Sequence, residues 1–466
     1  MPKLLWSLTA LELAEGYHRG TVTPLDASHA VLDRLHAVNG KINAVIAWDA
    51  DAVLRSAAES AERWKQKIPR SALDGVPITV KDNLYMRGLR ATWGSKLLAD
   101  FAPDEDEPAV ARLRDAGLVL LGKTNVPEFT IQGYTSNAIF GTTFNPHALG
   151  KTPGGSTGGG AAAVAAGIGP LALGTDGGGS IRRPAAHCGL FALKPTIGHI
   201  ARYGGFPQIL SDFEVIGLIA RTAADLEALR CLLAAPDPRD PRTLAGSATM
   251  PAIPAQPRVA YMPAIADHPV DPSIAVEVRK VADALSDSGA EVETIAAPFD
   301  YEQVTAAWGT VMTCGLAWYL SRFPEWREKV NPAAQAAAVE GAQKSTQQLL
   351  DALSKVAQVR VAAAEFFGRY ELLLSPAAAA LAWPAAEVFP AQIDGKPVGP
   401  RGHAVFTAWM NVAGVPAVTV PLKLTSDGGG IGLQLAAAHG RDRELSHFVQ
   451  SHPVFTRLPP LPLAEI

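Results

Sequence analysis

The sequence has few cysteines, little net charge and no long apolar run. Its three cysteines, Cys188, Cys231 and Cys314, are an odd number at wide spacing, which predicts no disulfide framework and favours a cytoplasmic protein. The formal net charge is −4, so no basic surface predicts a nucleic-acid partner. No uninterrupted apolar run reaches the roughly 18 residues of a membrane span. The N-terminal residues also lack the small-residue cleavage site of a signal peptide.

Metal-ligand spacing is missing as well. No pair of histidines has the spacing of a zinc protease, and the cysteines do not cluster, so we expect no catalytic metal. What remains is an ordinary globular composition, 48% hydrophobic and 18% charged over 466 residues. The length alone is compatible with two or three domains.

The order of predicted elements favours an α/β protein. Residues 8–66 have helical periodicity. The β-branched run Val76–Val80 predicts a strand that ends at Lys81. Strands and helices then alternate to residue 235, which predicts a mainly parallel sheet. Residues 236–257 are predicted to form an exposed loop, and residues 301–370 are predicted to be helical with mostly buried aromatics.

Gly154–Thr196 is the most unusual stretch of the chain. It holds Ser156 and Ser180, each surrounded by glycines, which mark places where the backbone itself must approach another group closely. Consecutive N–H groups of such a turn can converge on one negative oxygen, as an oxyanion hole requires. A flexible linker is the alternative, but the apolar runs 161–166 and 168–173 predict a buried helix and a buried strand inside the stretch.

Two short motifs match known patterns without the context that those patterns need. Residues 117–124 match a phosphate-binding P-loop, but the four variable positions are Leu-Val-Leu-Leu and predict a strand, so we expect no ATP site. Residues 154–158 match the nucleophile elbow of α/β-hydrolases, yet no strand is predicted before them. A Ser-Asp-His hydrolase stays open as an alternative because several histidines lie downstream.

The same stretch carries a resemblance to a known family. Gly154–Thr196, together with DGVPITVKDN at residues 74–83 and AGVPAVTVPLKLTSDGGGIGLQL at residues 413–435, resembles the amidase signature enzymes. The similarity covers nearly the whole chain and is weakest from about 240 to 370. It implies a single α/β domain, with a large twisted mixed β-sheet covered by α-helices on both faces. The parts expected within 1–466 are an N-terminal helical segment (1–66), a signature core (67–235), a variable substrate-side region (236–400) and C-terminal core strands (401–466).

The resemblance also implies the roles of individual residues. Lys81 matches the family's catalytic base, Ser156 the bridging serine that follows a cis peptide bond, and Ser180 the nucleophile. The implied oxyanion hole consists of the N–H groups of Gly177, Gly178, Gly179 and Ser180. The residues expected to contact substrate are Gly133, Tyr134, Thr135, Thr157, Cys314, Trp318 and Trp383.

The chain departs from the family pattern at two positions. Thr157 stands where a second serine is common, and it keeps the hydroxyl. Gly177 stands where a larger residue is common, which is expected to loosen the oxyanion turn without removing its N–H.

A serine–lysine site is chemically reasonable if the lysine is neutral. A serine hydroxyl is a weak nucleophile that requires a neighbouring base. Lysine serves as that base only when neutral, and burial can lower its pKa of about 10.4 by several units. From the residues alone, a strand-end lysine that points into water would be the preferred interpretation of Lys81. His187 is the only histidine of the stretch, and beside Cys188 it is predicted to be structural.

The family reaction is amide hydrolysis through an acyl-serine, without a cofactor, on a small-molecule amide. Homodimers are common in the family. One alternative is the amidase subunit of a tRNA-dependent glutamyl or aspartyl amidotransferase, although residues 132–141 differ from the GSSTENSAFG loop of those subunits. A catalytically dead binding homologue is the other.

The aromatics of the variable region give an expectation about substrate. No unpaired cation is obvious there, so the pocket is predicted to be poor in charge. Since burying an unpaired charge is costly, we expect bulky apolar or aromatic amides and carbamates to be preferred over glutamine.

Overall fold

A mixed β-sheet of 11 strands runs through the computed structural model, which describes residues 4–247, 250–458 and 460–466. Residues 248 and 249 of the predicted 236–257 loop lie outside the described residues. The strands, in their order across the sheet, are β1 (Val45–Ala47), β3 (Val119–Thr124), β2 (Pro77–Lys81), β6 (Leu171–Asp176), β8 (Val215–Ala220), β7 (Phe191–Lys194), β14 (Ala417–Leu424), β15 (Gly430–Ala436), β11 (Leu372–Pro376), β9 (Arg258–Tyr261) and β10 (Glu291–Thr294).

The prediction of a mainly parallel sheet was wrong for its centre. Strands β3, β2 and β6 are parallel, as are β11, β9 and β10, but every pairing from β6 through β8, β7, β14 and β15 to β11 is antiparallel. Parallel neighbours need a long crossover, usually helical. Only a loop with a short 3₁₀ turn, Ser211–Phe213, joins β7 to β8, so these two strands pair antiparallel. The mixed sheet implied by the family resemblance is confirmed.

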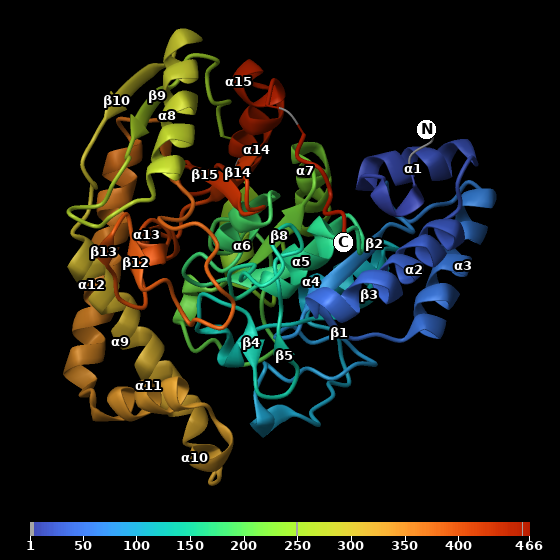
Figure 1. Cartoon of the computed structure of the whole chain (residues 1–466), viewed down its shortest axis with the longest axis horizontal. Helices are drawn as coiled ribbons and strands as arrows, with labels where there is room; N and C mark the ends of the chain where they lie inside the picture. Colours follow the sequence, from blue (N-terminus) through green and yellow to red (C-terminus); the bar gives the residue numbers. More distant parts are fainter. Residues whose placement is uncertain (1–3, 248–249, 459) are drawn as a thin grey trace.

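Helices flank the sheet along its whole width (Figure 1). They are α1 (Ala10–Arg19), α2 (Pro24–Ile42), α3 (Ala50–Lys65), α4 (Pro108–Asp115), α5 (Gly158–Ala165), α6 (Arg182–His187), α7 (Ala223–Leu233), α8 (Pro272–Asp287), α9 (Tyr301–Leu320), α10 (Trp326–Lys329), α11 (Pro332–Gln343), α12 (Thr346–Phe367), α13 (Ala408–Ala413), α14 (Asp442–Ser451) and α15 (Pro453–Thr456). Two two-stranded ribbons complete the fold: β4 (Ser136–Asn137) with β5 (Gly141–Thr142), and β12 (Gln392–Ile393) with β13 (Lys396–Pro397).

The predicted helical segments are present and begin where the sequence signals them. Thr9 and Thr23 each accept a hydrogen bond from a backbone N–H three residues on, which caps α1 and α2. The predicted helical region 301–370 consists of α9–α12, which gather at the side of the molecule opposite the N-terminal helices (Figure 1). Among the residues that the structure describes, no helix is both long and apolar enough to cross a bilayer. The division of the chain at residues 66, 235 and 400 stays a prediction.

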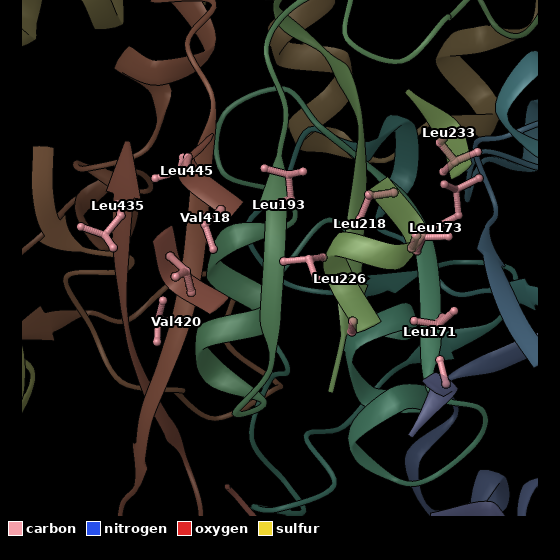
Figure 2. Close-up of a cluster of buried hydrophobic side chains, with 14 of the residues drawn as sticks. Leu171, Leu173, Leu193, Leu218, Leu226, Leu233, Val418, Val420, Leu435 and Leu445 are labelled. Carbon is pink, nitrogen blue, oxygen red and sulfur yellow. The ribbon is translucent and has the colours of Figure 1, made fainter. Parts of the chain in front are cut away.

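Both faces of the central strands are buried because successive side chains of a strand point to opposite faces. On β6, Leu171 and Leu173 belong to one buried cluster and Ala172 to another. The first cluster joins side chains of β6, β7, β8, β14 and β15 to α7 and α14 (Figure 2). This two-sided burial fixes β2 and β6, the strands whose carboxyl ends carry the predicted site.

Removing a side chain from this cluster should destabilise the whole fold. We expect Leu173→Ala to lower the free energy of unfolding by about 2–5 kcal/mol, because the side chain is fully buried and leaves a cavity. The matched control is Leu350→Ala on α12, where 59% of the side chain is exposed and the expected change is within about 0.5 kcal/mol. Equal losses in denaturant titrations of the two variants would contradict this assignment of the core.

Candidate active site

Lys81 ends β2 with its side chain fully buried, so the alternative of a lysine pointing into water is wrong. Its Nζ lies 2.9 Å from Ser156 Oγ and 2.9 Å from Thr175 Oγ1, and it donates to the Thr175 carbonyl at 3.1 Å. The neighbouring parallel strand β6 supplies Thr175. The amine is thus held between the end of one strand and the serine loop.

Burial lowers the pKa of Lys81 from 10.5 to about 7. The carboxylates of Glu214 and Asp176 act against this by raising the pKa, whereas Arg202 and Arg183 lower it further. Desolvation penalises the ammonium form most strongly. A substantial share of Lys81 is therefore neutral near pH 7 and able to accept a proton.

Ser156 lies in the loop that leads into α5. The Gly155–Ser156 peptide bond is cis, as the family resemblance implies. The next residue links the two glycine-rich segments, because the Thr157 N–H donates to the Ser180 carbonyl at 3.0 Å. Thr157 is the residue that replaces the family's second serine. Its hydroxyl donates a hydrogen bond to the Thr175 carbonyl.

Ser180 follows a glycine turn that begins where β6 ends, at Asp176. The Asp176 carboxylate accepts the N–H groups of Gly179 (2.7 Å) and Ile181 (3.0 Å), and it pairs with the Arg182 guanidinium at 3.0 Å. Burial alone would raise the pKa of Asp176, but Arg182 outweighs it and holds this pKa well below its usual range. A buried carboxylate that stays ionised at neutral pH therefore organises the turn.

The carbonyl groups of the turn are held by side chains from distant parts of the chain. Trp308 Nε1 donates to the Gly177 carbonyl at 2.7 Å. Arg183 and the Thr407 hydroxyl both donate to the Gly178 carbonyl. These contacts fix the peptide planes of the turn.

The N–H groups of the turn are not equivalent. Those of Gly177, Gly178 and Ser180 have no acceptor within the described part of the chain, whereas that of Gly179 is bonded to Asp176. Of the four amides that the family resemblance implied for an oxyanion hole, that of Gly179 is thus already occupied, and the role of the other three stays a prediction. Gly177 replaces a larger residue of the family pattern. The Leu210 side chain occupies the space beside it, because Leu210 Cδ1 lies 2.5 Å from the position of a Cβ on Gly177.

The serines open onto a cavity of about 180 Å³. Its lining residues are Thr130, Ile131, Gln132, Gly133, Ser156, Thr175, Gly177, Gly178, Ser180, Arg183, Leu210, Glu214, Trp308, Met312, Ala333, Ala337, Pro400, Arg401 and His403. Lys81 lies behind Ser156 rather than in the wall. No hydrogen bond joins the Ser156 and Ser180 hydroxyls among the described residues, which is common before substrate binds.

Of the predicted substrate contacts, only Gly133 lines this cavity. Tyr134, Thr135, Thr157, Cys314, Trp318 and Trp383 do not. Half of the Trp318 side chain is exposed to solvent, and the Arg322 guanidinium covers its ring at 4.0 Å. Trp383 instead packs against His403, 4.7 Å away between ring centroids.

The sequence missed the charged and polar residues of the wall: Arg183, Glu214, Arg401 and His403. The expectation of a pocket poor in charge is wrong for this cavity. No local signal distinguishes Arg401 from a surface arginine, since it lies in a proline-rich loop far along the chain. Among the described residues, no group of three or more His, Cys, Asp or Glu side chains is arranged to hold a metal ion.

The histidines do not assemble a Ser-Asp-His site. His187 is buried and bonded to the Ala380 carbonyl, and burial lowers its pKa to about 4. His403 lines the cavity, but neither ring nitrogen has a partner among the residues that the structure describes. Within the part of the chain that the structure describes, no carboxylate is therefore in place to orient the His403 imidazole at the cavity.

Comparisons with known proteins agree with this geometry. The Amidase family model matches residues 26–445. The acylamidase of Rhodococcus erythropolis is 33% identical over 448 residues, covering 93% of this chain and 92% of that protein. A glutamyl-tRNA(Gln) amidotransferase subunit of Acidothermus cellulolyticus is also 33% identical, over 92% of this chain and 90% of its own. The crystal structure of a bacterial aryl acylamidase superposes with a TM-score of 0.87 at 27% identity, covering 98% and 97% of the two chains.

The glycine turn should not tolerate a side chain at position 179. Gly179 has a φ of +108°, and a Cβ there would lie 2.2 Å from Arg183 Nη1 and 2.3 Å from Thr407 Oγ1. We expect Gly179→Ala to lower the free energy of unfolding by about 1–3 kcal/mol more than the control Gly204→Ala. Gly204 also has a positive φ, +73°, but has open space around its Cβ position. Equal losses for both variants would mean that the turn can relax.

Proposed function

The chain belongs to the amidase signature family, and on that basis we propose that it hydrolyses the C–N bond of a small carboxylic amide through an acyl-serine intermediate. The observation that carries the proposal is the 2.9 Å contact between Lys81 Nζ and Ser156 Oγ, behind a cavity that Ser180 shares. A buried amine whose pKa is lowered to about 7 is a suitable base for this chemistry.

The proposed reaction begins with two proton transfers. Neutral Lys81 accepts the proton of the Ser156 hydroxyl while Ser156 accepts that of Ser180, whose oxygen attacks the amide carbonyl. The resulting oxyanion accepts hydrogen bonds from the N–H groups of Gly177, Gly178 and Ser180, which line the cavity and have no acceptor within the described residues. The turn needs no reorganisation at that moment, because Asp176 and the carbonyl contacts already fix it.

The second half of the cycle uses the same relay in reverse. Lysinium at position 81 returns a proton through Ser156 to the amide nitrogen, so that ammonia or an amine leaves and the acyl group stays on Ser180. A water molecule, deprotonated through Ser156 and Lys81, then attacks the acyl-enzyme. Collapse releases the carboxylic acid and returns the proton to Ser180, so protons balance without a cofactor.

The amidase subunit of a tRNA-dependent amidotransferase is the second candidate function. Its support is the 33% identity to the Acidothermus cellulolyticus protein over most of both chains. Activity of the purified chain on simple amides without partner subunits would favour the stand-alone amidase. A cytoplasmic location and a homodimeric state stay predictions.

The nucleophile and the base can be tested separately. We expect an activated fluorophosphonate to label Ser180, and peptide mapping to find no adduct on Ser156. Lys81→Ala, Ser156→Ala and Ser180→Ala should each lower kcat/KM by several orders of magnitude, with strongly non-additive effects in combination because the three act as one unit. The control is Lys123→Met, which removes another fully buried lysine outside the cavity wall and should retain activity. Full activity of Lys81→Ala at neutral pH would overturn the mechanism.

The pH dependence of the reaction should report Lys81. Because only the neutral amine is a base, kcat/KM should be low at acidic pH and should rise with pH through a single ionisation near 7. The Glu214 carboxylate raises the pKa of Lys81. Glu214→Gln should therefore move the ionisation to lower pH. A pH–rate profile of this variant that moves to higher pH would contradict the assignment of Lys81 as the base.

A further inference from the structure

Arg401 lies in the wall of the cavity beside Ser180, and no carboxylate of the described residues pairs with it. Its guanidinium lies over the Trp308 ring, 4.1 Å from the centroid. Its Nη2 is buried and has no hydrogen-bond partner among the described residues, although part of the side chain is accessible through the cavity. Arginine stays protonated at neutral pH even where burial lowers its pKa, as it does here. An unpaired, largely buried cation is costly, so this arrangement favours an anion that binds the accessible part of the guanidinium from the cavity.

The other charges of the wall do not neutralise Arg401. Arg183 adds a second guanidinium, whose hydrogen bonds go to backbone carbonyls and the Thr407 hydroxyl. Glu214 is the only carboxylate of the wall, and it already pairs with Arg202 at 3.3 Å and accepts from Asn83 at 3.1 Å. The cavity therefore presents an excess of positive charge to whatever enters it.

The location of Arg401 limits the shape of that anion. Its Nη2 lies 3.4 Å from the position that a Cβ on Gly178 would occupy, directly beside the glycine turn that lines the cavity. An anionic group bound by Arg401 would thus lie close to a carbonyl bound at Ser180. The cavity of about 180 Å³ is also smaller than the roughly 300–1,000 Å³ of pockets for drug-sized ligands.

We propose that Arg401 binds a carboxylate of the substrate, and that the preferred substrates are half-amides of short dicarboxylic acids. This inference rests on the proposed amidase function and names its substrate class. Planar guanidinium groups match carboxylates with two parallel hydrogen bonds. Trp308 is a positioning residue, because its ring supports Arg401 while its indole N–H holds the Gly177 carbonyl.

A pair of substrates that differ only in charge tests the role of Arg401. Succinamate and succinamide have the same reacting bond and nearly the same shape, but only succinamate carries a carboxylate. We expect the wild-type enzyme to favour succinamate in kcat/KM, and Arg401→Gln to lower the succinamate-to-succinamide ratio by roughly 30-fold. Arg401→Lys, which keeps the cation but not the planar fork, should retain part of the preference.

The chain offers a matched control for this substitution. Arg322 also lies over a tryptophan ring, that of Trp318, but outside the cavity. Arg322→Gln should leave the ratio unchanged. An equal loss on both substrates in Arg401→Gln, or a wild-type preference for succinamide, would overturn the inference.

Binding without turnover separates this inference from the proposed function. Calorimetric titration of succinamate into Ser180→Ala should show binding that is at least ten-fold weaker in Ser180→Ala/Arg401→Gln. Equal affinities of the two variants, or no binding to either, would reject Arg401 as a carboxylate site even if the enzyme hydrolyses neutral amides. If instead the proposed function is wrong, Ser180 should stay unlabelled and the wild type should hydrolyse no amide. The titration would then still test whether Arg401 binds a carboxylate.

Discussion

The burial of one amine is the constraint on which the rest of the site depends. Lys81 can act as a base only when its amine is neutral, and burial favours the neutral form. Its Nζ is buried between β2 and β6 because both faces of the sheet are covered. The carboxylates that could restore its charge are occupied: Asp176 pairs with Arg182, and Glu214 with Arg202. The fold therefore balances desolvation against nearby charge so that the pKa comes to about 7.

A second buried charge, that of Asp176, organises the glycine turn before Ser180. Asp176 stays ionised through Arg182 and binds the N–H of Gly179, which removes that amide from the free donors of the turn. Two distant side chains hold carbonyl groups of the same turn. Trp308 donates to the Gly177 carbonyl, and Thr407 donates to the Gly178 carbonyl. The catalytic turn is thus assembled from one continuous sequence motif but fixed by segments far from it.

We propose that residues outside the motif select the substrate. The family members that this chain matches include an acylamidase and an amidotransferase subunit, so the shared centre does not define the substrate. In this chain the wall of the cavity carries Arg401 and His403, whereas the aromatics Trp318 and Trp383 are not part of it. The excess positive charge of that wall favours small anionic amides over the bulky apolar amides that the aromatic content suggested.

The sequence by itself determined the family, the α/β class and the helix caps, because these depend on local patterns and on one long continuous motif. The same motif singled out Lys81, Ser156 and Ser180 as the candidate site residues. It did not determine the antiparallel centre of the sheet, since strand–helix alternation does not specify which strands become neighbours. Only the tertiary structure decided whether Lys81 is buried or exposed. It also decided which distant side chains enter the cavity: Arg401 has no periodic or motif signal, and its unpaired charge is visible only once Trp308 and Gly178 stand beside it.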